Sequence, residues 1–565
     1  MGLIRTPHAA VIVWNYDDRL SVSGINSSFD KVDEMIISTV SLMSISTNKT
    51  KADPVGTFNF TLAPTRNWVS VLTPGSWCAI MMSNEPLTED SFNFANAKQV
   101  KMLGRIETVR VNVAVNDDGS RSTSYVVNGQ DWGSIFNNIV YVDPIVQDPS
   151  DQTKSQSNAL YQQFSANIFS DNGDPLAVSV PKNLNTILSI IGGPIKLPET
   201  DRLAKATHDV SLPSEVSNYF QFIDGFDATT HSTKFTELLT LVWGPLKNED
   251  DYDNSTPELT GIGWMDPFTM VGQHSLWSIL QENSNYALNE MFPEMFWPDD
   301  ERGPQLLLYN RIKPFSYTDQ PASPDKIDTS MRSKFQLVAS HKLDDEAIIN
   351  VNAGTNWRDK FNFVEIKPDI NELSVLGVVL KAKSQAYQGN PSNSDVFDRE
   401  GFRPIMFSIK QLPFNTSGVT DPIQADKLEK WVNLVKEWFF DSHKLLNGHI
   451  VMHGSSEYIP VGDNIMFDAG LIGLTPNYNS ASVGKTGIFV LGHVESVQNN
   501  FSVNADGTRS FQTTVQFVRG IIVDEHKSLI GEGTIDTLAS TLTATDSTNS
   551  KTVYEFAEHD NPQES

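Results

Sequence analysis

Several stretches of this sequence contain residue types that bind phosphate or metal ions in other proteins. Residues 479–486 read Asn-Ser-Ala-Ser-Val-Gly-Lys-Thr, close to a phosphate-binding loop, but the first glycine of that motif is missing and a predicted strand follows instead of a helix. His449 and His453 have the spacing of one strand face, yet a zinc site needs three or four ligands and no third is recognisable. We therefore interpret both patterns as structural.

Acidic runs and the single cysteine are the remaining candidates for catalysis. Residues 249–253 lack the ligand spacing and the glycine of a calcium loop, which favours a solvated loop. Residues 299–301, Asp-Asp-Glu, offer paired carboxylates as in glycoside hydrolases, but a chain with 69 acidic residues contains such runs by chance. Cys78 lies in a predicted strand without an evident partner, and no Gly-x-Ser-x-Gly motif occurs. We expect no catalytic residue, no metal ligand and no cofactor, hence a protein that is not an enzyme.

Composition limits the class of protein. The 565 residues are too many for one core, and 39% hydrophobic residues are enough for several. A single cysteine excludes internal disulfides and fits synthesis in a reducing cytoplasm. No apolar run approaches the roughly 20 residues of a membrane span. The net charge of −27 argues against a nucleic-acid-binding protein. It is compatible with a surface that DNA must pass without binding, because like charges repel.

The strongest signal is an internal repeat. Residues 103–122 and 491–510, which are 388 positions apart, align without a gap and are identical at more than half of their 20 positions. Each copy alternates apolar and polar residues like a half-buried strand and then reaches an Asp-Gly pair, which favours a hairpin turn. We therefore predict two related antiparallel β-barrel domains. The identities include Leu103/Leu491, Gly104/Gly492, Glu107/Glu495, Val109/Val497, Val115/Val503, Asn116/Asn504, Asp118/Asp506, Gly119/Gly507, Arg121/Arg509 and Ser122/Ser510, and the glycine turn at Gly75 recurs at Gly462.

The expected fold is α+β and mainly β, with the two barrels separated in sequence. Residues 1–132 would form the first barrel, and residues 331–375 with 447–525 the second. An α-rich middle domain would occupy residues 133–330 and a helical insertion residues 376–446. Residues 526–565, rich in Ser, Thr and Asp, favour a flexible or partner-docked tail.

Periodicity predicts the individual elements. Strands are expected at residues 36–45, 56–62, 335–338, 348–351, 361–366, 375–381, 449–452 and 459–467, with a short buried strand at 306–309. Helices are expected at residues 131–138, 158–169, 184–191, 234–243 and 274–292. A further helix would begin near Asp421 and Pro422, carry the apolar stripe Leu428, Trp431, Val432, Val435, Trp438 and Phe439, and end at a left-handed Asn447-Gly448.

A series of short motifs resembles one family, the baseplate hub proteins of contractile-tailed bacteriophages, which adapt the tail tube to the central spike. Each motif is weakly specific, and their order and spacing over about residues 1–525 carry the resemblance. They are Gly129-Gln-Asp131-Trp132-Gly133, Tyr141-Val-Asp143-Pro144, Leu288-Asn289-Glu290-Met291-Phe292, Arg311-Ile-Lys-Pro314-Phe315, Gly401-Phe-Arg403, Ile459-Pro-Val-Gly462-Asp463-Asn464-Ile465 and the closing hairpin to Arg519-Gly520.

The resemblance implies a virion protein assembled in the host cytoplasm. It implies two tube-like barrels in each chain and a homotrimer, so that six barrels form a ring. Such a ring would join a six-fold tail tube, or its initiator proteins, to a three-fold central spike, contact other baseplate proteins, and line a channel through which DNA passes without specific binding. The alternatives are a tail-tip cell-wall hydrolase or glycosidase, a receptor-binding tail protein, and two ordinary domains with unrelated partners.

Overall fold

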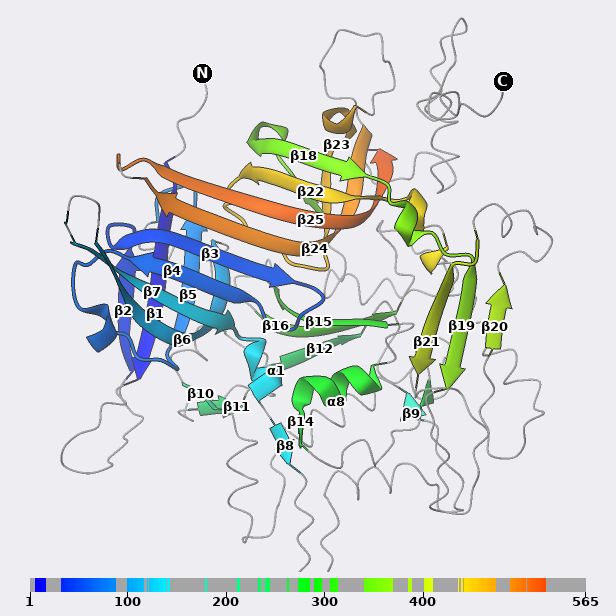
Figure 1. Cartoon of the computed structure of the whole chain (residues 1–565), viewed down its shortest axis with the longest axis horizontal. Helices are drawn as coiled ribbons and strands as arrows, with labels where there is room; N and C mark the ends of the chain where they lie inside the picture. The colour runs from blue at the N-terminus through cyan, green and yellow to red at the C-terminus, as the bar shows by residue number, and fades with distance from the viewer. Residues whose placement is uncertain are drawn as a thin grey trace, which may run out of the picture.

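The computed structural model is built around one large antiparallel sheet (Figure 1). It describes residues 6–16, 32–87, 99–115, 119, 121–138, 140–142, 178–179, 211–213, 232–234, 239–243, 262–263, 273–284, 289–296, 305–312, 340–368, 385–388, 401–409, 435, 438–440, 442–473, 488–504 and 506–524. Thirteen strands form this sheet. Eleven follow one path: β18 (Ile348–Gly354), β22 (Leu446–His453), β25 (Arg509–Asp524), β24 (Ile488–Val503), β3 (Leu42–Thr50), β4 (Thr57–Leu62), β7 (Arg121–Asp131), β6 (Val100–Val115), β5 (Trp77–Ser83), β1 (His8–Tyr16) and β2 (Val32–Ser38). Beside them, β23 (Asn464–Asp468) pairs antiparallel with β24 and parallel with β17 (Ser340–Lys342).

The sheet contains the same strand arrangement twice. We call β3, β4, β7, β6 and β5 the first module, and β18, β22, β25, β24 and β23 the second module. The long hairpins β6–β7 and β24–β25 have the same register after a shift of 388, including a β-bulge at the same place. The predicted duplication is therefore confirmed. Matching pairs are Arg105↔Gln130 with His493↔Val518, Ile106↔Gly129 with Val494↔Phe517, Thr108↔Asn128 with Ser496↔Gln516, and Val115↔Arg121 with Val503↔Arg509.

The equivalence extends to the other strands of each module. Gly75 and Gly462 both have positive φ, +92° and +84°, in the turn before β5 and β23. Their amides donate to the carbonyls of Ile106 (2.6 Å) and Val494 (2.9 Å), which are themselves equivalent. The bulge between Leu42 and Ser44 in β3 recurs between Ile348 and Asn350 in β18. Even irregular features of the two modules are thus duplicated.

The strands of the two modules do not close into separate barrels within the described residues. Instead β24 of the second module pairs with β3 of the first, so one continuous sheet runs through both. A strand can make ladder hydrogen bonds on both sides, and the distal half of β24 uses its second side for this contact. The sequence predicted two barrel domains separated by a middle domain, and the shared sheet corrects this expectation.

Each module has its own core, but the second hairpin contributes to both. Phe501 and Phe511, near the end of that hairpin, are buried in the core of the first module with Ile45 and Phe60. The core of the second module contains Phe517 and also side chains from the middle of the chain, Phe292, Leu307 and Tyr309. Burial of these aromatic rings ties the first module, the second module and the middle segment together.

The described part of the middle of the chain is mostly strand rather than helix. Residues 239–243, predicted as helix, form strand β12, and the predicted helix 274–292 is helical only as α8 (Leu276–Asn283) before strand β15 runs through Pro293. Short apolar runs fit helix and strand equally, so pairing with β16 decided them. The strands are β8 (Val140–Val142), β9 (Val178–Ser179), β10 (Ser211–Pro213), β11 (Ser232–Lys234), β12 (Leu239–Trp243), β13 (Ile262–Gly263), β14 (Gln273–Ser275), β15 (Asn289–Phe296) and β16 (Gln305–Ile312).

Some of the other predictions of local structure are confirmed and others are wrong. The strand at 36–45 is interrupted by a turn between β2 and β3, and residues 459–463 precede β23 instead of belonging to it. Asn447-Gly448 is not a helix stop but lies inside β22. The strands predicted at 56–62, 306–309, 348–351, 361–366 and 449–452 are confirmed within β4, β16, β18, β19 (Phe363–Pro368) and β22. The elements predicted at 158–169, 184–191, 335–338 and 375–381 lie outside the described residues.

The remaining short elements complete the description. Strands β20 (Gln385–Gln388) and β21 (Pro404–Ile409) flank β19, so the segment predicted as a helical insertion also contributes strands, while Val435 and residues 438–439 are helical. The residues predicted at 131–138 form the end of β7 and helix α1 (Ser134–Asn138). The 3-10 helices are η1 (Trp68–Ser70), η6 (Asp345–Ala347), η7 (Trp357–Asp359), η9 (Ser442–Lys444) and η10 (Ala469–Ile472).

Candidate functional site

The junction between the two modules joins them into one sheet. Strands β24 and β3 pair in antiparallel register from Ser496↔Thr50 to Ser502↔Ser44. Ser46 Oγ donates to Asn500 Oδ1 at 2.7 Å across this junction. On the buried face Asn499 donates to Thr47 at 3.3 Å and accepts from Thr513 at 2.8 Å, so its amide is satisfied. A buried and satisfied amide fixes the register, because a slip would leave it unpaired.

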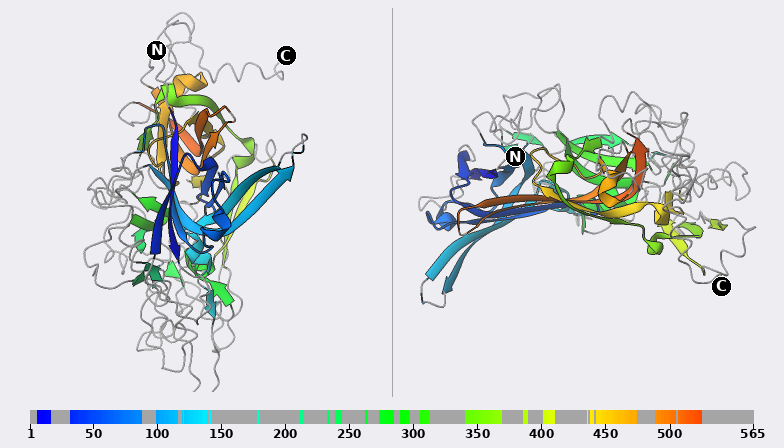
Figure 2. Two further views of the ribbon diagram at one scale, coloured as in Figure 1. Left: turned by 90° about the vertical axis from the view of Figure 1, so that its left-hand side faces the viewer. Right: turned by 90° about the horizontal axis from the view of Figure 1, so that it is seen from above.

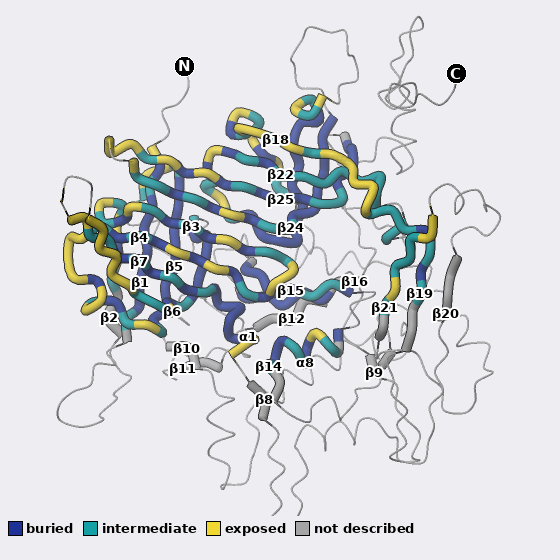
Figure 3. Tube along the Cα trace, viewed as in Figure 1, coloured by how far each residue is buried: buried dark blue, intermediate teal, exposed yellow. Residues whose placement is uncertain are grey.

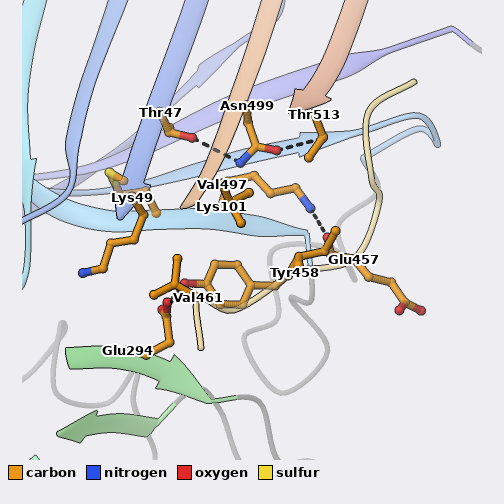
Figure 4. Close-up of a pocket in the computed structure, with 12 residues that line it drawn as sticks. Thr47, Lys49, Lys101, Glu294, Glu457, Tyr458, Val461, Val497, Asn499 and Thr513 are labelled. Carbon is orange, nitrogen blue, oxygen red and sulfur yellow. Dashed lines mark hydrogen bonds between the residues drawn. The ribbon is translucent and has the colours of Figure 1, made fainter. Parts of the chain in front are cut away.

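A charged cluster lies beneath the junction, where both modules meet the middle strands (Figure 4). Lys49 of β3 forms an ion pair with Asp131 of β7, and both side chains are almost completely buried. Lys101 of β6 donates to the Glu457 carbonyl at 2.7 Å. Burial lowers the pKa of Lys101 to about 7, against the opposing charge of Glu457. Charges withdrawn from water to this extent persist only with partners, so the cluster holds its elements in one arrangement.

Glu294 of β15 is the acidic centre of this cluster. Its carboxylate accepts hydrogen bonds from the backbone amides of Val461 (2.8 Å) and Met295 (2.7 Å) and from the Tyr458 hydroxyl. Burial raises the pKa of Glu294 to about 7, although the charge of Lys49 and these hydrogen bonds oppose the shift. Burial also raises the pKa of Tyr458. Glu294 therefore attaches the middle strands to the loop before β23 of the second module.

A second ion-pair group spans the same three parts of the chain. Lys51, just after β3, contacts Glu290 of β15 at 2.9 Å and Glu495 of β24 at 3.0 Å. His493 Nε2 lies 3.8 Å from Glu290, with His493 fully buried. Glu495 is the equivalent of Glu107, one of the identities between the repeats, and Glu290 belongs to the Leu288–Phe292 motif. These contacts stabilise the junction and contain no arrangement of nucleophile and base.

The residues singled out from the sequence do not converge on a site. His449 and His453 lie on the same face of β22, opposite Asn352 and Gln512 respectively, and Cys78 is buried inside β5 as predicted. Burial raises the pKa of the Cys78 thiol far above its usual range. Residues 249–253, 299–301 and 479–486 are not among those described. The described ranges contain no group of three or more potential metal ligands, and no helix there is long and apolar enough to cross a membrane.

The cluster at the junction was not found from the sequence. Its members come from positions as distant as 49, 131, 294 and 458, and nothing in the local pattern marks them as partners. Three sequence motifs gave a partial indication of the cluster, because each supplies or adjoins one of its residues. They are Gly129–Gly133, Leu288–Phe292 and Ile459–Ile465.

No family model and no curated protein matches the sequence. Among solved structures, the chain is similar to a tail protein from Neisseria meningitidis, with TM-score 0.41 and 11% identity over 91% of this chain and 96% of that one. It is also similar to the prophage MuSo2 tail protein from Shewanella oneidensis, with TM-score 0.37 and 9% identity over 91% and 98%. The Francisella PdpA-VgrG complex gives TM-score 0.37 and 7% identity over 92% of this chain and 59% of that chain. TM-scores and sequence identities this low do not assign a function. The function has to be inferred from the geometry of this chain.

Proposed function

We propose that this protein is a structural hub protein of a contractile phage tail. Three copies form a ring of six modules, which joins the six-fold tail tube to the three-fold central spike and lines the DNA channel. The observation that carries the proposal is the β24–β3 junction, in which two modules of equal register already share one continuous sheet. A chain that contains two equivalent modules lets a trimer present six similar positions to a hexagonal neighbour.

The order of the sequence motifs supports the same assignment. Two of them supply residues of the junction: Asp131, which pairs with Lys49, and Glu290, which pairs with Lys51. The partners would be two further copies of the chain, tail tube or tube-initiator proteins, the central spike protein and other baseplate proteins. The location would be the baseplate of the virion, after assembly in the host cytoplasm.

The charge of the chain fits passage of DNA without specific binding. With a net charge of −27, the surface as a whole repels phosphate. A channel lined by this protein would therefore offer no sites at which an exiting genome is held. A basic channel surface in the assembled ring would contradict this part of the proposal.

The proposal is tested by mass and symmetry. Light scattering on the purified protein should give three times the mass of one chain, and projection images should show six similar lobes. A monomer at all concentrations would refute the ring. A hydrolase would instead clear suspensions of purified peptidoglycan, and a receptor-binding protein would attach to host cells as an isolated chain; the hub protein should do neither.

A further inference from the structure

One difference between the modules concerns strand pairing: among the described strands, only the long hairpin of the second module has a strand of the other module along its distal half. The distal half of β24 is paired with β25 on one side and with β3 on the other. The distal half of β6, its equivalent, is paired with β7 on one side and with no other described strand. β18, the equivalent of β3, is likewise the terminal strand of the sheet path, with β22 as its partner. Among the described residues, two complementary edges are therefore unpaired, one along the distal half of β6 and one along β18.

We propose that the distal half of β6 pairs with β18 of a second copy, in the register of the β24–β3 junction. This inference rests on the proposed function and specifies the contact between copies. The equivalences fix the register without adjustment. Each residue of β6 has the number of its equivalent in β24 minus 388. The bulge common to β3 and β18 makes Leu42 equivalent to Ile348 and Asn48 equivalent to Gly354. Each residue of β18 therefore has the number of its equivalent in β3 plus 306.

The side chains brought together by this register are complementary. Asn500 and Ser46, whose side chains share a hydrogen bond, become Asn112 opposite Asn352, whose side chains can also share one. The buried polar pair Asn499–Thr47 becomes an apolar pair. The proposed partners are Arg110↔Gly354, Val111↔Ala353, Asn112↔Asn352, Val113↔Val351 and Ala114↔Asn350. No like charges face each other, and no apolar side chain faces a charge.

Exposure of the edge side chains supports the same contact. Val111, Val113 and Val115 are 48%, 55% and 68% exposed, whereas Phe501, the equivalent of Val113, is 1% exposed in the core of the first module. Figure 2 shows that this end of the β6–β7 hairpin extends away from the body, and Figure 3 marks its exposed residues. A run of exposed valines on an unpaired edge is a site for strand addition. By equivalence, Val113 would lie opposite Val351, which packs at the margin of the second core.

The register is tested by disulfide formation between copies. The backbone amide of Lys51 donates to the Glu495 carbonyl, so Lys51 and Glu495 are a backbone-hydrogen-bonded pair of the two strands. Because such pairs alternate along an antiparallel ladder with pairs that lack backbone hydrogen bonds, Asn500 and Ser46 are a pair of the second kind. Its equivalent, Asn112–Asn352, would then have Cα atoms about 4.5 Å apart, within reach of a disulfide. The Asn112→Cys/Asn352→Cys protein should form covalent trimers on oxidation. The Val113→Cys/Asn352→Cys control, whose thiols point to opposite faces, should not.

The outcomes separate this inference from the proposed function. Trimers by mass that fail to cross-link at Asn112 and Asn352, or that cross-link equally in the control, would overturn the register and leave the ring intact. Protein that stays monomeric would overturn both.

A second variant measures the strength of the same contact. Val113→Lys should weaken self-association by about tenfold or more without lowering the melting temperature of the monomer, because this side chain is already exposed. Ile36→Lys on β2, where Ile36 is 45% exposed, is the matched control and should leave association unchanged. Equal self-association in Val113→Lys and the parent protein would contradict the inference.

Discussion

The ring of Phe58 on β4 fills the space above Gly129, its cross-strand partner on β7, where an added Cβ would lie only 2.2 Å from the ring. In the second module the same two positions hold the same residue types in exchanged order, Gly448 opposite Phe517. One aromatic ring per module thus covers the glycine at the start of each long hairpin, Gly104 or Gly492. The duplicated fold has kept the volume of this pair while its two residues changed places.

This exchange predicts a compensating double substitution. Gly129→Phe should unfold the protein at a markedly lower temperature, because its Cβ would lie 2.2 Å from both the Phe58 ring and the Arg105 carbonyl oxygen, and overpacking costs about 1–3 kcal/mol or more. Phe58→Gly/Gly129→Phe, which copies the arrangement of the second module, should recover part of that loss. Thermal denaturation of the two variants and of Phe58→Gly alone provides the comparison. A double variant less stable than Gly129→Phe would show that the two modules are not interchangeable here.

The turn glycine of the second hairpin is needed for its backbone conformation and not for close packing. Gly507 has φ +81°, and a Cβ added there would meet no atom within 4 Å. Gly507→Ala should therefore destabilise the protein by about 1–2 kcal/mol through backbone strain only. Gly354→Ala is the control, since that site is equally open but its φ is not positive. Chemical denaturation should show a loss for the first variant and none for the second.

The buried ion pair between Lys49 and Asp131 predicts strong coupling between the two side chains. Asp131→Leu leaves the Lys49 ammonium buried without its carboxylate and should cost about 3–5 kcal/mol. Lys49→Met/Asp131→Leu removes both charges, so its loss of unfolding free energy should be smaller than the sum of the losses in the two single variants. A double-mutant cycle measures this difference. Strict additivity would mean that the pair contributes nothing to the junction.

Glu294 predicts a pH dependence of stability. Because its pKa is raised from 4.5 to about 7 on folding, the native state prefers the protonated acid. The stability supplied by Glu294 is then fully present below about pH 4.5 and is lost as the pH rises through about 7, at most about 3 kcal/mol. In Glu294→Gln the change in melting temperature between pH 5 and pH 8 should be smaller than in the parent protein. Glu85→Gln, at an exposed carboxylate, should keep the parent profile.

The sequence by itself determined the duplication and most strands next to it. The alternation of Val109, Val111, Val113 and Val115 and the turn at Gly119 are local signals, and the structure has both hairpins where those signals place them. A repeated pattern needs no knowledge of distant contacts, because each hairpin is specified by its own turn and its own alternation.

Only the tertiary structure decided how the modules join. Strand β16 lies between Leu239–Trp243 and Asn289–Phe296 and pairs with both, which makes both of them strands. The two modules share one sheet because β24 pairs with β3. The charges of Lys49, Asp131 and Glu294 are likewise ordinary in the sequence and significant only where burial brings them together. Strand pairing and the removal of charge from water depend on neighbours far along the chain, so no local window of residues contains them.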